Sequence, residues 1–86
     1  MKTKTMEVKL DKGLEARPVA LLVQEASKYR SKVYIEYGDK RINAKSIMGM
    51  MNLPLGSGEE IKVVVEGDDE SEALEGIDRF LSSAAV

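Results

Sequence analysis

Apolar and polar residues alternate along three stretches of the chain, and a fourth short stretch follows a glycine turn. Alternation with a period of two predicts a strand that buries one face. The alternating stretches are residues 6–10, 32–37 and 61–66. Gly38-Asp39 predicts a tight turn, and residues 41–44 predict a return strand. The sequence therefore predicts four strands, two of which form a hairpin.

Two longer stretches carry apolar residues at helical spacing. Pro18 is tolerated only in the first turn of a helix, so the first helix begins near Ala16 and continues to about Lys28. A second helix near the C-terminus has a single apolar stripe. At its start, Asp69 and Glu72 have the spacing of a capping box.

A short helical segment follows Ser46, a residue type favoured at helix N-caps. At roughly 100° per residue, Ile47, Met50 and Met51 share one arc, and Met48 points elsewhere. A helix of about two turns cannot bury apolar side chains all round, so some of them stay exposed. The methionines either fill gaps in the core or form a partner-binding surface, and the pattern leaves both interpretations open.

The element order is β-α-β-β-α-β-α, which predicts an α+β fold. Eighty-six residues leave no room for a second core, so residues 1–86 form one domain. Helices and strands with one apolar face each predict a two-layer sandwich, with an antiparallel or mixed sheet whose other side is open to water. The same order fits a ferredoxin-like fold, which many RNA-binding modules use.

Composition and charge exclude several classes of function. Thirteen Lys and Arg against fifteen Asp and Glu give a net charge of −2, which argues against a nucleic-acid-binding surface. The absence of Cys and His excludes thiol nucleophiles, catalytic triads and most zinc sites. No metal or cofactor motif occurs, and no apolar run is long enough for a signal peptide or a membrane span. We therefore expect a cytoplasmic protein that binds neither membrane nor nucleic acid directly.

Two polar sites are candidates for chemistry. The glycine-containing loop from Gly13 to Pro18 leads into a helix N-terminus and forms either an anion site with Arg17 or a plain connection. Ser46 is either a helix cap alone or a phosphorylation site, because a phosphate is well tolerated at a helix N-terminus. Lys45 and Arg17 would then supply countercharge.

Gly13-Leu14-x-Ala16-Arg17-Pro18 and the segment from Asn43 to Met51 resemble the two signatures of HPr, the phosphocarrier family of the bacterial sugar phosphotransferase system. The resemblance covers essentially the whole chain. It implies an open-faced two-layer sandwich with a four-stranded antiparallel sheet and three helices on one face. Because the first strand is short and joined by a glycine-containing loop, we expect either a monomer or a dimer that exchanges this strand.

The resemblance also implies a function. HPr proteins accept a phosphoryl group from enzyme I on a histidine and pass it to enzyme II components. Glu15 occupies that position here, so phosphocarrier activity in sugar transport is the alternative rather than the first hypothesis. Ser46 matches the serine phosphorylated by the HPr kinase/phosphorylase of Gram-positive bacteria.

The chain is most similar to the catabolite-repression HPr subgroup, called Crh. In this subgroup the phosphoserine form is a co-effector of a catabolite control protein of the LacI type. We therefore predict a non-enzymatic regulator of carbon catabolite repression. The expected partner-binding residues are Arg17, Lys45, Ile47, Met48 and Met51.

Overall fold

Strands and helices follow one another in the order β-α-β-β-α-β-α, as the sequence predicts. The computed structural model describes residues 1–8, 16–51 and 58–82, and for residues 16–18 it describes the backbone only. The elements are β1 (Lys2–Glu7), α1 (Ala16–Ser27), β2 (Lys32–Tyr37), β3 (Lys40–Asn43), α2 (Ile47–Met50), β4 (Glu60–Glu66) and α3 (Glu70–Ser82).

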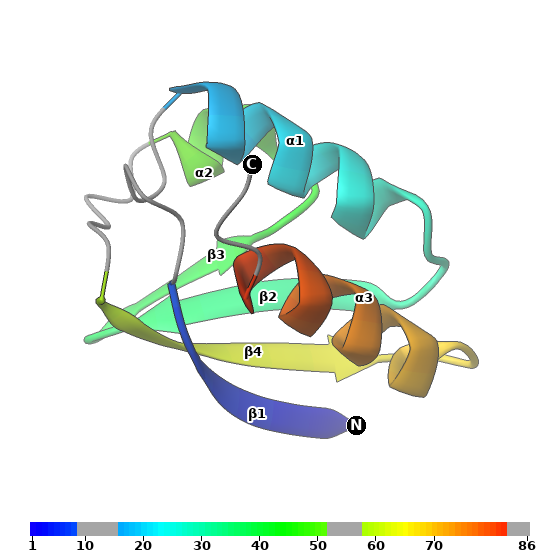
Figure 1. Ribbon diagram of the computed structural model, residues 1–86. Coiled ribbons are helices and arrows are strands. Elements are labelled where there is room, and N and C mark those ends of the chain that lie inside the picture. The colour runs from blue at the N-terminus through cyan, green and yellow to red at the C-terminus, as the bar shows by residue number, and fades with distance from the viewer. Residues whose placement is uncertain (9–15, 52–57, 83–86) are drawn as a thin grey trace.

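The four strands form one antiparallel sheet in the order β1-β4-β2-β3. Both long helices, α1 and α3, lie on one face of this sheet, and the opposite face is open (Figure 1). On the helix side, Val63 and Val65 of β4 pair with Ile35 and Val33 of β2. All four are at most 1% exposed, because the period of two places them in the same layer. The predicted open-faced α+β sandwich is confirmed, and its sheet is entirely antiparallel.

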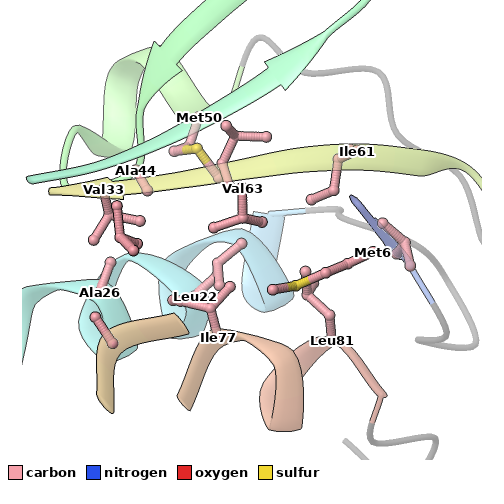
Figure 2. Close-up of a cluster of buried hydrophobic side chains, with 14 of the residues drawn as sticks. Met6, Leu22, Ala26, Val33, Ala44, Met50, Ile61, Val63, Ile77 and Leu81 are labelled. Carbon is pink, nitrogen blue, oxygen red and sulfur yellow. The ribbon is translucent and has the colours of Figure 1, made fainter. Parts of the chain in front are cut away.

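Apolar side chains from both layers meet between the sheet and the helices (Figure 2). The i, i+4 spacing places Leu22 and Ala26 on one face of α1, and Ile77 and Leu81 on one face of α3. All four side chains are fully buried. Burial of one Leu or Ile stabilises the fold by about 1.5–3 kcal/mol, so these two stripes hold the helices against the sheet.

β1 begins four residues earlier than the predicted strand at 6–10. Alternation of apolar residues begins only at Met6, because β1 is an edge strand with polar residues at most of its positions. Lys4 shares the face of Met6 and binds α3 through an ion pair of 2.6 Å between its Nζ and Asp78 Oδ2. Beyond the strand, Val8 continues the pairing through hydrogen bonds with Gly58 and Glu59. The predicted start was wrong because charge pairing replaces hydrophobic burial at this edge.

Asp69 ties the start of α3 to the connection between α1 and β2. Its carboxylate accepts hydrogen bonds from the backbone N–H groups of Arg30 and Ser31, both at 2.9 Å, and from the Ser31 hydroxyl at 2.5 Å. The Ser31 hydroxyl, followed by the Arg30 N–H, holds the pKa of Asp69 below its ordinary value. The predicted capping box with Glu72 is wrong, because this carboxylate bonds to residues 38 and 39 positions away.

Candidate functional site

Ser46 stands at the junction of β3 and α2, with the geometry of an N-cap. Its backbone is extended (φ −102°, ψ 109°), and its Oγ accepts a hydrogen bond from the Gly49 N–H at 3.3 Å. The Ser46 carbonyl accepts from Met50 N–H at 2.9 Å, and its own N–H donates to the Asn43 carbonyl at 3.0 Å. The predicted capping role is therefore confirmed. Ser46 is half-buried, and the hydrogen bond that its Oγ accepts is long, so this oxygen is only weakly hydrogen-bonded.

Gly49 allows α2 to pack closely at this junction, and the sequence analysis did not identify it. A Cβ at this position would lie 3.1 Å from Ile42 Cγ2 and 3.4 Å from Ser46 Oγ. The absence of a side chain therefore keeps α2 against β3 and leaves the space beside the serine hydroxyl open. The sequence did contain a signal for this role of Gly49. Glycine inside a helix costs about 1 kcal/mol relative to alanine, so its presence there indicates a packing constraint.

Lys45 bonds to the end of α1 rather than to Ser46. Its Nζ donates to the Tyr29 carbonyl at 2.7 Å, in a partly buried contact, and its N–H donates to Asn43 Oδ1 at 2.8 Å. The Tyr29 N–H bonds to the Ala26 carbonyl, so the ammonium lies at the C-terminal end of α1, where the helix dipole favours a cation. Lys45 thus anchors the segment that carries Ser46 to α1.

Three apolar side chains beside Ser46 are exposed. Ile47 is 41% exposed, Met48 80% and Met51 58%, whereas Met50 is fully buried. We call these three exposed residues the methionine surface. The arc predicted for Ile47, Met50 and Met51 is not buried as a unit, because the single turn of α2 inserts only Met50 into the core. Met50 therefore fills the core, as one of the two interpretations predicts, whereas partner binding by the exposed Met48 and Met51 stays a prediction.

The predicted site residues fall into a described and an undescribed group. Ser46, Lys45 and the methionine surface are consecutive or nearly so along one segment, which packs against α1 and β3. α2 lies beside α1, on the same side of the sheet (Figure 1). The backbone of Arg17 is in the first turn of that helix, but its side chain lies outside the described residues. Glu15 and the rest of the predicted anion loop also lie outside them.

The described carboxylates form no candidate metal site, and two of the described phenols are hydrogen-bonded to carboxylates. Along residues 1–8, 16–51 and 58–82, no three acidic side chains are grouped to hold a metal ion. The Tyr29 hydroxyl donates to Glu25 at 2.9 Å and the Tyr37 hydroxyl to Glu59 at 2.9 Å. Burial and then Glu25 raise the pKa of Tyr29, and the bond to Glu59 raises that of Tyr37, so neither phenol is a base at neutral pH. Within the same ranges no helix is long and apolar enough to cross a membrane.

Comparison with known families and proteins gives a consistent set of relatives. The family model described as "PTS HPr component phosphorylation site" matches residues 2–83. The HPr-like protein Crh of Halalkalibacterium halodurans is 52% identical over 81 residues, covering 94% of this chain and 96% of that protein. The HPr-like protein Crh of Bacillus subtilis is 47% identical over 76 residues, covering 88% of this chain and 89% of that protein.

Solved structures similar to this chain are also HPr and Crh proteins. The crystal structure of HPr-C-His from Thermoanaerobacter tengcongensis has a TM-score of 0.92 at 47% identity, covering 96% of this chain and 93% of that one. The crystal structure of Bacillus subtilis Crh, described as a dimer with a swapped domain, has a TM-score of 0.75 at 46% identity, covering 94% and 93%.

Proposed function

The chain belongs to the HPr family, and we propose that it is a Crh-type regulator of carbon catabolite repression whose partner binding is switched by phosphorylation of Ser46. Its relatives at 52% and 47% identity are HPr-like proteins and not enzymes, which matches the regulatory class predicted from the sequence. The observation that carries the proposal is the position of a weakly held serine hydroxyl directly beside the methionine surface.

Phosphorylation at Ser46 is a phosphoryl transfer from ATP, catalysed by HPr kinase/phosphorylase. The Oγ forms a bond to the γ-phosphorus, the bond from that phosphorus to ADP breaks, and the hydroxyl proton is released. The product carries about −1.5 to −2 charge and three strong acceptor oxygens. The neighbouring Gly49 N–H keeps an acceptor, so the fold stays unchanged while the surface charge changes.

The partner expected from the HPr resemblance is a catabolite control protein of the LacI type. A partner that presents Arg or Lys to phospho-Ser46 gains charge-assisted hydrogen bonds. Its apolar residues then cover Ile47, Met48 and Met51, which are already exposed. Arg17 belongs to the same contact in this proposal, because it lies in the first turn of α1, the helix that packs against α2. Lys45 contributes by holding the segment in place through the Tyr29 carbonyl.

The test compares the unmodified protein, the phosphorylated protein and Ser46→Ala after incubation with ATP and the kinase. We expect kinase labelling of the wild type only, and repressor affinity at least about tenfold higher for the phosphorylated form, as for one or two charge-assisted bonds. Amide NMR spectra should differ only around residues 43–51. Equal repressor affinity of all three forms, or shifts spread through the sheet, would contradict the proposal.

The alternative is the phosphocarrier role in sugar uptake, with enzyme I and enzyme II components as partners. A carrier needs a group that both accepts and releases phosphorus readily, and imidazole does so. Glu15 occupies the position of the family's histidine, so we expect no labelling by phosphoenolpyruvate and enzyme I. Glu15→His should restore some labelling. Phosphoenolpyruvate-dependent labelling of the unaltered protein would favour the carrier role instead.

We further propose a cytoplasmic protein that exists as a monomer and as a β1-exchanged dimer. The dimer is supported by two observations: Bacillus subtilis Crh was solved as a dimer with a swapped domain, and Met6 is the only buried residue of β1. The contacts of β1 with β4 and α3 form equally well between two copies. Light scattering over a range of concentrations tests this, and a strictly monomeric protein at millimolar concentration would contradict it.

A further inference from the structure

We propose that Met48 and Met51 are sites of reversible oxidation, at which a peroxide converts the methionine surface from apolar to polar. The chain has five methionines and no cysteine, so methionine sulfur is the only sulfur available to an oxidant. The oxidation itself is independent of the proposed function, whereas its effect on a partner rests on that function.

The five methionines divide sharply by exposure. Met48 and Met51 are 80% and 58% exposed, and Met1 is 74% exposed. Met50 is fully buried and Met6 is 4% exposed, and both lie within the core cluster (Figure 2). A peroxide in solution reaches the exposed side chains in the native state, but it reaches the buried ones only when the protein opens locally. Two of the three exposed methionines therefore concentrate oxidation beside Ser46.

The chemistry is a two-electron oxygen transfer. A sulfur lone pair attacks one oxygen of hydrogen peroxide, the O–O bond breaks, and the second oxygen leaves as water after proton transfer from the first. The products are methionine sulfoxide and water, with sulfur oxidised by two electrons and the peroxide reduced by two. Methionine sulfoxide reductases reverse the change with two electrons and two protons from a dithiol reductant, which becomes a disulfide while the sulfoxide oxygen leaves as water. The modification is therefore reversible.

The sulfoxide changes what the surface can bind. It places a strong hydrogen-bond acceptor where a thioether stood, and burial of that acceptor against apolar residues without a donor is unfavourable. Ile47 is not oxidised and keeps part of the surface apolar. The fold and the Ser46 cap are unaffected, because Met50 holds α2 in the core. Phosphorylation of Ser46 thus strengthens partner binding, whereas oxidation of the neighbouring methionines weakens it.

The first experiment needs no partner. The protein is treated with hydrogen peroxide, and oxidation at each methionine is followed by peptide mass spectrometry and native hydrophobic-interaction chromatography. We expect Met1, Met48 and Met51 to react first, with Met6 and Met50 at least about tenfold slower because they require opening. After peroxide treatment, the wild-type protein should be retained less strongly on the hydrophobic-interaction column.

The matched control is Met48→Leu/Met51→Leu, which keeps its retention while Met1 still oxidises. Oxidation of Met50 at the rate of Met48, or unchanged wild-type retention after full oxidation of Met48 and Met51, would overturn the inference.

The second experiment titrates the LacI-type repressor with phospho-Ser46 protein in three states: untreated, oxidised, and oxidised then treated with the reductases. We expect oxidation to weaken binding at least about tenfold, as for loss of a hot-spot contact, and reduction to restore it. The leucine double variant should bind equally with and without peroxide. If the untreated phospho-form fails to bind, the proposed function is wrong while the oxidation sites stand. If the oxidised form binds as tightly as the untreated one, the inference is overturned.

Discussion

Replacement of Lys45 by methionine tests whether this residue anchors the Ser46 segment. The change removes the ammonium that bonds the Tyr29 carbonyl at 2.7 Å and keeps a stem of similar length. A hydrogen bond from a charged donor contributes about 1.5–3 kcal/mol net, and partial exposure places this one near the lower end. We expect Lys45→Met to lower the free energy of unfolding by about 1.5–2 kcal/mol. In a domain of this size, that loss corresponds to a fall in Tm of roughly 6–16 °C.

The assay is urea unfolding followed by circular dichroism, with Lys40→Met as the matched control. Lys40 is an exposed lysine in β3, so its replacement should change the stability by less than about 0.5 kcal/mol. The two variants should have the same m-value as the wild type, because the same surface is exposed on unfolding. A loss of stability in Lys45→Met no larger than that in Lys40→Met would refute the anchoring role.

The same variant separates anchoring from direct countercharge. If Lys45 acts through the Tyr29 carbonyl, amide exchange of residues 45–51 becomes faster in Lys45→Met, because the segment has lost its tie to α1. The repressor affinity of its phosphorylated form then falls only modestly. A loss of affinity above about tenfold without faster exchange would instead assign Lys45 to the partner contact.

Three further predictions concern the contacts of Gly67 and Asp69 just before α3, and the methionine surface. Gly67→Ala should destabilise the fold by about 2–5 kcal/mol in urea unfolding, because Gly67 has a φ of +156° and a Cβ there would lie 2.7 Å from Ser31 Cα. Since the pKa of Asp69 is lowered in the folded protein, its stabilising effect should be complete well above pH 4 and lost as the pH falls through that lowered pKa. The stability difference between wild type and Asp69→Asn should therefore shrink from pH 7 to pH 3, and a constant difference would argue against this linkage. Met48→Asp should weaken repressor binding by more than about 1 kcal/mol in a titration while the unfolding midpoint stays unchanged. An unaltered affinity would remove this residue from the contact.

The sequence by itself determined the elements whose burial repeats with a regular period. β2 was predicted at its observed bounds, and α1 and β4 within one residue. Each element buries one continuous face, so its apolar residues recur at the period of its own backbone. The N-cap geometry of Ser46 was also predictable, because capping involves only the next few residues along the chain. The HPr motifs likewise lie in short contiguous segments.

Tertiary structure alone decided the features that depend on residues distant in sequence. The strand character of residues 2–5 comes from pairing with β4 and from charge contacts with α3, and neither leaves an apolar period. Asp69 caps a connection 38 residues away, and Lys45 bonds a carbonyl 16 residues away. The division of α2 into a buried Met50 and an exposed Met48 depends on which side of one helical turn meets the core. Local pattern cannot specify that side, because a single turn is too short to define a stripe.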